Sequence, residues 1–288
     1  MGRGWKRVEL QVSGIEREFL WKAPEGRRPK GAILVLHDGG GHHYQWCNAN
    51  GPIVGPQVRF SEMAVAEGFA VLLLDSSDRI TDREGRLCGK VWDDEVRNRP
   101  NLDLPFIGTV IRDYVPRLFP PGGKGVIFIT GHSSGGYMTA RASTHFDDLV
   151  TAFAPVSSGD PYGWHRVCEA GTTLRSAVHG RGFDNETGKH IPEPGACTSE
   201  TLAHELPWDS TRPDVKPAFR VFRHHEDGIN DRSCNEKISR LLRRNGYHGQ
   251  PDFVLYGGRR NLAHHLWLDD YNRPILDFFN AQIPSASK

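Results

Sequence analysis

The pentapeptide Gly-His-Ser-Ser-Gly at 131–135 places Ser133 between two segments that could expose its hydroxyl. The apolar run Val126–Ile129 predicts a strand before it, and residues 137–142 predict a helix after it. A serine with a glycine two residues away on each side, between a strand and a helix, is typical of a nucleophile elbow. A tight glycine turn is the alternative interpretation. The strand–turn–helix context favours Ser133 as a catalytic nucleophile.

A serine hydroxyl becomes a nucleophile when a base takes its proton and an acid orients that base. In enzymes with this elbow the acid and then the histidine follow the serine along the chain. Asp227 follows the apolar segment 219–222, and we assign it as the acid. Asp231 and Glu226 remain alternatives. Each could instead be a solvated loop residue, and Asp231 could cap a helix.

Two histidines, His264 and His265, follow the last predicted strand. We assign His265 as the base and keep His264 as the alternative. Adjacent histidines also occur at 42–43 and 224–225, which could suggest a metal site. Neighbouring side chains in an extended chain point in opposite directions, so such a pair seldom gives two ligands to one ion. We therefore predict no metal.

The negative oxygen that forms during attack on a carbonyl needs backbone N–H donors. The N–H of Ser134 is the first candidate, and the glycine-rich loop His-Asp-Gly-Gly-Gly at 37–41 should supply the second. Gly39 is our choice there, followed by Gly40. The loop lacks the Lys-Ser/Thr that a phosphate-binding P-loop requires. Further candidates for substrate contact are His132 and Trp267, although tryptophans such as Trp267 can equally fill a core.

The rest of the chain supplies alternating strands and helices, which predict a mostly parallel sheet with helices on both faces. An alternating segment, 5–22, predicts an antiparallel hairpin at the sheet edge. Further strands are predicted at 32–36, 69–74, 126–129, 152–156, 219–222 and 252–256, and helices at 58–67, 103–118, 233–244 and 271–279, besides the one after the elbow. The candidate residues all follow strands, where active sites of such sheets lie.

Residues 1–288 are predicted to form a single domain, with its core in 1–156 and 216–288. Periodicity breaks down from about residue 157, and we interpret 157–215 as an insertion over the sheet. Long segments of this kind are often functional lids. The aromatic residues of this stretch favour a packed lid; they are Tyr162, Trp164, Phe183 and Trp208.

The formal net charge of +1 gives no reason to expect nucleic acid or an anionic membrane as partner. The apolar runs are far too short to span a bilayer. The N-terminus lacks a secretory h-region, so we expect a cytoplasmic protein, or a secreted one if a leader has been removed. The five cysteines show no Cys-x-x-Cys spacing, and Cys168 with Cys197 is the pair to consider for a disulfide.

Five segments together resemble the bacterial poly(3-hydroxybutyrate) depolymerase and feruloyl-esterase-like branch of the α/β-hydrolases. They are Ser13–Phe19, Leu36–Gly41, Asn101–Ile107, Gly131–Gly136 and His265–Trp267. The resemblance implies an α/β-hydrolase fold and a serine esterase without cofactor. It supports Ser133, Asp227 and His265 as the triad.

The chain departs from the family pattern in the oxyanion loop, where His37-Asp38 replaces His-Gly, and before the acid, where the spacing is one residue shorter. It shows no separate substrate-binding domain, which favours soluble or oligomeric esters over crystalline polymer. We expect a monomer or small homo-oligomer. A small-molecule or oligomeric ester is the expected substrate, and a peptidase or a non-catalytic binding protein are the alternatives.

Overall fold

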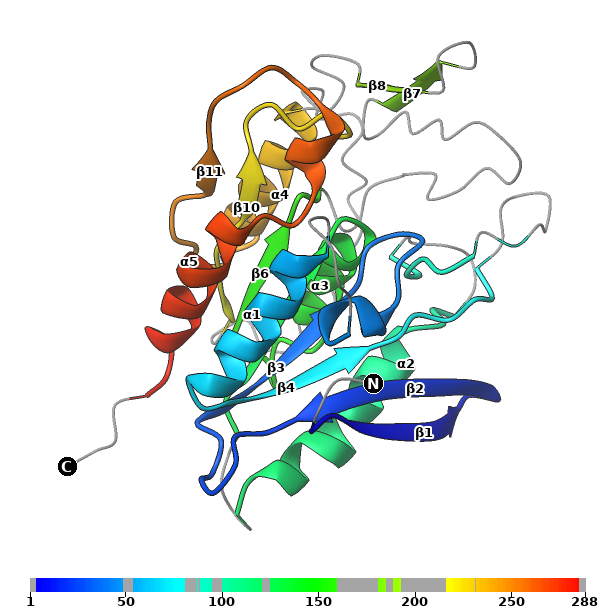
Figure 1. Cartoon of the computed structure of the whole chain (residues 1–288), viewed down its shortest axis with the longest axis vertical. Helices are drawn as coiled ribbons and strands as arrows, with labels where there is room; N and C mark the ends of the chain where they lie inside the picture. The colour runs from blue at the N-terminus through cyan, green and yellow to red at the C-terminus, as the bar shows by residue number, and fades with distance from the viewer. Residues whose placement is uncertain are drawn as a thin grey trace.

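A computed structural model describes residues 4–48, 54–80, 87, 89–94, 100–120, 125–159, 181–184, 189–192, 216–230 and 232–284 (Figure 1). For residues 181–184, 189–192, 233 and 234 the backbone alone is described. Most of the predicted insertion, including Trp164 and Trp208, therefore lies outside the described residues. So does the pair Cys168 and Cys197.

The centre of the described part is a nine-stranded sheet with the order β1-β2-β4-β3-β5-β6-β10-β11, in which β9 also pairs with β6. All neighbours from β4 to β11 run parallel, whereas β1–β2 and β2–β4 are antiparallel. The strands are β1 Lys6–Val12, β2 Ile15–Lys22, β3 Gly31–Leu36, β4 Phe69–Leu74, β5 Ile127–His132, β6 Ala152–Val156, β9 Ala218–Phe219, β10 Phe222–His224 and β11 Phe253–Leu255. The mostly parallel sheet predicted from the sequence is confirmed.

The edge hairpin β1–β2 turns at Ser13 and Gly14, which both have positive φ values, 50° and 76°. Two such residues match the twist of the strands that they connect. The register pairs Val12 with Ile15 and Lys6 with Trp21. The predicted hairpin is therefore confirmed, and β2 also joins it to the main sheet through β4.

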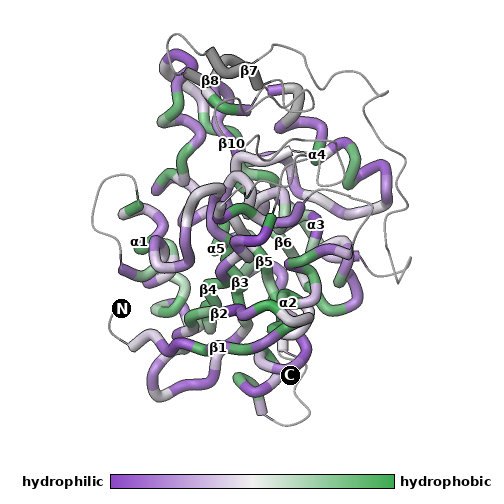
Figure 2. Tube along the Cα trace, turned by 90° about the vertical axis from the view of Figure 1, so that its right-hand side faces the viewer, coloured by the Kyte–Doolittle hydropathy of each residue, from purple (hydrophilic) through white to green (hydrophobic). Residues whose placement is uncertain are grey.

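Helices cover both faces of the sheet, as predicted (Figure 1). Apolar residues of α1 (Gly55–Ala66) and α5 (Asp269–Asn280) share one core cluster, and those of α2 (Leu104–Thr109), α3 (Ser134–His145) and α4 (Arg232–Arg244) share the other. Strands β3 and β4 are buried along their whole length, and Figure 2 shows their hydrophobic residues at the centre of the molecule. Continuous apolar runs are what a parallel sheet covered on both faces requires.

Three details differ from the sequence predictions. The strand predicted at 219–222 is two short strands, because β9 pairs only with the start of β6 and β10 pairs further along it. The helix predicted at 103–118 continues α2 through a π turn at Val110–Tyr114 and a 3₁₀ turn at Val115–Leu118. A short hairpin, β7 (Arg181–Asp184) with β8 (Lys189–Pro192), lies inside the segment interpreted as irregular.

No helix in the described part of the chain has the length and apolar character needed to cross a bilayer.

A buried ion pair joins the edge hairpin to the segment before α2. Arg17 in β2 donates to Asp103 Oδ1 at 2.6 Å, and their side chains are 1% and 0% exposed. Arg17 also donates to the carbonyls of Leu102 and Asp75. Asp103 accepts from the N–H groups of Ser77 and Asp93 as well. The two charges are therefore compensated by several hydrogen bonds at once, which is the condition for burying an ion pair at tolerable cost.

Replacing Arg17 by Met should lower the free energy of unfolding by about 3–5 kcal/mol, because the carboxylate of Asp103 stays buried without its cation. Urea unfolding followed by circular dichroism measures the change. Arg59 pairs with Asp269 on the surface, where the side chains are 56% and 52% exposed. The control Arg59→Met should therefore cost less than about 1 kcal/mol. Equal losses in both variants would contradict the proposed importance of the buried pair.

Candidate active site

Ser133 occupies a strained turn between β5 and α3. Its φ of 53° and ψ of −116° lie in a region that residues other than glycine rarely adopt. The Ser133 N–H donates to the Val156 carbonyl at 3.0 Å, and its own carbonyl accepts from Tyr137 N–H at 3.0 Å. The conformation is thus held by β6 on one side and by α3 on the other.

The glycines of the pentapeptide allow this turn to sit against the end of β3. A Cβ atom on Gly135 would lie 2.2 Å from the Leu36 carbonyl oxygen, and one on Gly131 would lie 2.5 Å from the Gly135 carbonyl oxygen. Both distances are far inside van der Waals contact with backbone atoms. No side chain fits at either position, which explains why the motif needs both glycines.

Ser133, His265 and Asp227 form a continuous chain of hydrogen-bonding distances. His265 Nε2 lies 2.9 Å from Ser133 Oγ, and His265 Nδ1 lies 2.9 Å from Asp227 Oδ2. His265 is 4% exposed and Asp227 is fully buried, whereas Ser133 is half-buried. The structure therefore brings together the three residues assigned from the sequence, in the geometry that a Ser-His-Asp triad uses.

The loop after β10 orients the carboxylate of Asp227 for this contact through backbone hydrogen bonds. Its Oδ1 accepts hydrogen bonds from the N–H groups of Ile229 and Asn230, at 2.7 and 2.9 Å. Burial by itself raises the pKa of this carboxyl group. The nearby imidazole of His265 and the two backbone N–H groups outweigh burial, so the pKa of Asp227 is lowered. The carboxylate is therefore ionised and oriented toward His265.

The alternative residues lie elsewhere. The His264 ring stacks on that of His224, with centroids 3.7 Å apart, and its Nδ1–H donates to the Glu226 carbonyl. The Glu226 side chain lies near His225, and Asp231 is outside the described residues. His264 and His265 both lie in the 3₁₀ turn Leu262–His265, which directs their rings to different partners, and only His265 reaches Ser133.

His132, a predicted substrate contact, is buried against the backbone of His265. It is 2% exposed, and its Nε2–H donates to the carbonyl of His265 at 2.7 Å. Burial lowers the pKa of His132, although the nearby carboxylate of Asp38 acts in the opposite direction. A neutral His132 can hold the His265 backbone without adding a charge beside the imidazole.

The glycine loop 37–41 lies close to the start of α3 at Gly39. Gly40 N–H already donates to the Lys90 carbonyl at 2.6 Å, and Gly41 N–H donates to the Asp38 carbonyl. Within the described residues the N–H of Gly39 has no acceptor, and a Cβ on Gly39 would lie 3.7 Å from Ser134 Cβ. The N–H of Ser134 is in the first turn of α3, where helix N–H groups lack an internal partner. The backbone N–H groups of Gly39 and Ser134 therefore belong to neighbouring residues and are the two candidate donors to an oxyanion.

Trp92 connects these two donors, a role that the sequence did not indicate. Its Nε1–H donates to the His37 carbonyl at 2.8 Å, and its backbone N–H donates to Ser134 Oγ at 3.1 Å. The side chain is fully buried, with its ring 5.1 Å from the His37 ring. Trp92 thus links the glycine loop to the N-terminus of α3.

Trp267 belongs to the core. It is 1% exposed, packs against Trp46, Phe60 and Tyr271, and donates from Nε1 to Asn272 Oδ1. Its ring is enclosed by these core residues, which leaves almost no surface for contact with a substrate. Aromatic-rich sequence alone does not separate a pocket wall from a core, and here the core interpretation applies.

The lowered pKa of Asp227 predicts a pH-dependent contribution to stability. The folded-state pKa lies below the unfolded value of about 3.9, so ionised Asp227 stabilises the fold above about pH 4, and this is lost as pH falls through the folded pKa. The difference in free energy of unfolding between wild type and Asp227→Asn should therefore be constant above about pH 5 and shrink as the pH falls below about 4. Urea unfolding at several pH values measures it.

Asp148 is an exposed carboxylate. The control Asp148→Asn should follow the wild type at each pH. A wild-type minus Asp227→Asn difference that stays constant across the range would contradict the interpretation.

No protein-family model and no curated protein sequence matches the chain. Solved structures do match. The acylaminoacyl peptidase of Pyrococcus horikoshii aligns with a TM-score of 0.61 and 14% identity over 99% of this chain and 42% of that one. An arylesterase aligns with a TM-score of 0.59 and 15% identity over 99% of this chain and 87% of its own.

Est1E from Butyrivibrio proteoclasticus aligns with a TM-score of 0.55 and 14% identity over 96% of this chain and 98% of that one. The chain thus spans less than half the length of the peptidase but nearly the whole of Est1E. At these identities the likeness concerns the fold. Together with the sheet order and the elbow between β5 and α3, it shows that the chain has the α/β-hydrolase fold.

Proposed function

We propose that the protein is a serine hydrolase that cleaves carboxylic esters through an acyl-enzyme. The observation that carries this proposal is the unbroken chain from Ser133 Oγ through His265 to the buried carboxylate of Asp227, at 2.9 Å for each step. A structural serine would need neither the positive φ of this turn nor a buried His–Asp pair aimed at its hydroxyl.

The first half of the reaction forms the acyl-enzyme. His265 Nε2 takes the Ser133 proton as Oγ bonds to the ester carbonyl carbon, and the carbonyl oxygen becomes an oxyanion. Asp227 stabilises the imidazolium and keeps Nδ1 protonated. Collapse of the tetrahedral intermediate breaks the bond to the alcohol oxygen, which receives the proton from His265 Nε2 and leaves.

The second half releases the acid. Water gives its proton to His265 Nε2 and attacks the acyl carbon, and the second tetrahedral intermediate expels Ser133 Oγ, which takes the proton back. In both halves the backbone N–H groups of Gly39 and Ser134 donate to the oxyanion. The occupied N–H of Gly40 favours Gly39 as the loop donor. The nucleophile, base, acid and oxyanion donors all come from the chain, and water is the second reactant.

The proposed substrates are short-chain, hydroxyalkanoate-oligomer or aromatic, feruloyl-type esters, free in solution. The motif resemblance supports this class. The fold likeness to an arylesterase agrees with it but does not extend to substrate. The proposal assumes no nucleic acid or membrane partner and a monomer or small homo-oligomer.

An amidase or peptidase acting on small peptides is the second candidate. The same triad cleaves amides, and the alignment with the acylaminoacyl peptidase over 99% of this chain favours keeping it. A binding protein without activity is disfavoured by the 2.9 Å contacts within the triad.

Ser133→Ala should abolish hydrolysis, with a loss of about six orders of magnitude in kcat, because the nucleophile acts as a unit with its base. The measurement uses p-nitrophenyl acetate to octanoate, a hydroxybutyrate oligomer and methyl cinnamate, each nitrophenyl ester beside its matching p-nitroanilide. Ser143→Ala is the matched control, since Ser143 is buried in α3, nearly three helical turns after Ser133.

Activity on esters alone supports the esterase, and comparable activity on the anilides moves the assignment to the amidase. If Ser133→Ala were as active as the wild type on any substrate, the elbow would not be the site.

Trp92→Phe should lower kcat by about tenfold with little change in KM. The variant keeps a buried ring but loses the N–H that holds the His37 carbonyl, so the loop carrying Gly39 is less well placed. Removing an oxyanion donor outright costs about 10²–10³ in kcat, which sets the upper limit. Steady-state kinetics on the best ester separates kcat from KM.

Trp46→Phe is the control for this ring exchange. Trp46 is equally buried, but its Nε1–H has no hydrogen-bond acceptor among the described residues. The Trp46→Phe variant should therefore have the kcat of the wild type. An equal loss in both variants would mean that Trp92 acts only through packing.

A further inference from the structure

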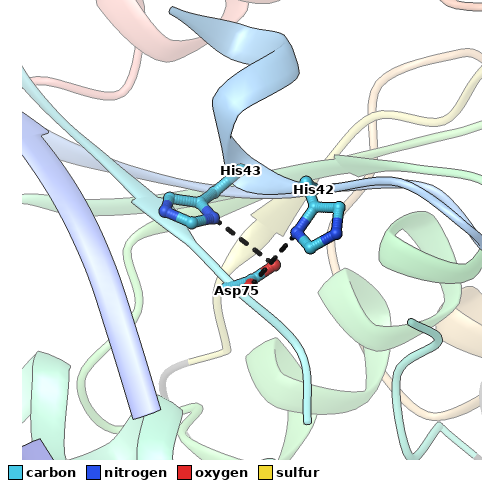
Figure 3. A group of neighbouring side chains, drawn as sticks. All are labelled: His42, His43 and Asp75. Atoms are coloured by element: carbon cyan, nitrogen blue, oxygen red, sulfur yellow. Dashed lines mark ion pairs between the residues drawn. The ribbon is translucent and has the colours of Figure 1, made fainter. Parts of the chain in front are cut away.

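A second cluster of chemically active side chains lies beyond the glycine loop. His42 and His43 directly follow that loop, and Asp75 follows β4 (Figure 3). The two histidines face the same carboxylate, unlike the pairs at 224–225 and 264–265. The backbone changes conformation between the two residues: His42 is extended, whereas His43 begins the 3₁₀ turn His43–Trp46. This change turns both rings toward Asp75. The prediction that adjacent histidines diverge is therefore wrong for this pair.

The donor atoms of the cluster are spaced for one small cation. His42 Nδ1 lies 3.5 Å from Asp75 Oδ2, and His43 Nδ1 lies 3.4 Å from Asp75 Oδ1. One ligand atom from each residue falls within 4.8 Å of the others. Ligands that are each 2.0–2.1 Å from a tetrahedral Zn²⁺ lie about 3.3–3.4 Å apart. The two nitrogen–oxygen spacings, 3.5 and 3.4 Å, are close to that value, although each ends on a different oxygen of Asp75.

Two of these atoms are buried without a hydrogen bond. His43 is 0% exposed, and its Nδ1 has no hydrogen-bond partner within the described residues. Asp75 Oδ1, which faces it, has none either, because its other neighbour, His37 Nε2 at 3.2 Å, already accepts from the Ser76 N–H. Buried polar atoms of this kind are uncommon and call for an explanation. A cation between them would satisfy both lone pairs.

The surroundings of His43 fit a metal ligand as well. Its Nε2 lies 2.8 Å from Glu18 Oε1 on β2, on the side of the ring away from Asp75, at an angle outside that of a hydrogen bond, so a small turn of either side chain would complete the contact. A carboxylate beside the remote nitrogen of a ligating histidine fixes the ring and raises its basicity, and metal sites commonly contain this pair. Glu18 would therefore orient the His43 ring without itself binding the metal.

We propose that His42, His43 and Asp75 bind one Zn²⁺ ion, with the fourth position open. Two imidazole nitrogens and one carboxylate oxygen form a donor set for a borderline ion and disfavour Mg²⁺ and Ca²⁺, which prefer oxygen ligands. The proposal revises the sequence prediction of no metal. It does not depend on the proposed esterase activity.

Lys90 is the group that a metal must displace. Its Nζ lies 2.6 Å from Asp75 Oδ2 and 3.1 Å from the Ser76 carbonyl. The ammonium thus holds one oxygen that Zn²⁺ would take, and its side chain is 24% exposed, so it can turn toward solvent. Because Lys90 competes with the metal, removing its charge should strengthen Zn²⁺ binding, whereas removing a ligand should weaken it.

The experiment is isothermal titration of metal-free full-length protein with ZnCl₂. Wild type should bind one Zn²⁺ per chain. His42→Ala should bind at least about tenfold more weakly, because a ligand is lost, and Lys90→Met about fivefold more tightly, because a competing cation is lost. His42 is chosen over the buried His43 because its side chain is 50% exposed, so the variant should fold. Circular dichroism checks this.

A second readout is thermal unfolding. Zn²⁺ should raise the Tm of wild type and Lys90→Met more than that of His42→Ala at the same concentration, because an ion that binds only the folded state stabilises it according to its affinity. His248 is exposed on the loop between α4 and β11, away from the cluster. The control His248→Ala should bind Zn²⁺ as wild type does. Equal affinity in wild type and His42→Ala, or no binding by wild type, overturns the proposal.

Discussion

The close approach of α3 to the end of β3 is the constraint on which the rest of the site depends. Side chains are excluded at Gly131 and Gly135 because backbone carbonyls occupy their space. Ser133 between them holds a positive φ that costs on the order of 1–3 kcal/mol. The sheet stabilises this turn, since β5 pairs with β3 and β6 on its two sides. The distance between Ser133 and the glycine loop is therefore fixed by packed backbone, and no flexible side chain is needed to set it.

A second layer holds the glycine loop from the other direction. Asp103 accepts from Arg17 on the edge hairpin and from the N–H of Asp93, next to Trp92. Trp92 in turn binds the His37 carbonyl. One buried carboxylate thus connects the sheet edge, the segment that covers the glycine loop, and the loop itself. Two of the segments that carry the family resemblance, 13–19 and 101–107, supply Arg17 and Asp103, which support the loop through these contacts.

The sequence predicted the fold well where one physical signal dominated. Continuous apolar runs found β3, β4 and β6, because strands buried on both faces have no polar alternation, and the paired turn residues Ser13 and Gly14 found the edge hairpin. It failed where neighbouring pairings decide the structure. The division of 219–222 into β9 and β10 depends on which part of β6 each strand meets, and no local property of four residues contains that information.

The candidate site shows the same division between local and distant information. The elbow is encoded by five consecutive residues, so Ser133 could be chosen from the chain alone. The choice between His264 and His265 needed the 3₁₀ turn at 262–265, which sends one ring toward Asp227 and the other toward His224. Trp92 and Trp267 are alike in sequence terms, but one links the two candidate oxyanion donors and the other fills the core.

The convergence of the His42 and His43 rings on Asp75 also follows from a single turn in the backbone. Adjacent side chains point in opposite directions in an extended chain, but in a turn their directions depend on the local backbone: His264 and His265 diverge inside one 3₁₀ turn, whereas His42 and His43 converge at the start of another. A rule drawn from strand geometry therefore fails at the first residue of a helix, and loops that enter short helices beside a sheet are where paired histidines can converge on one carboxylate.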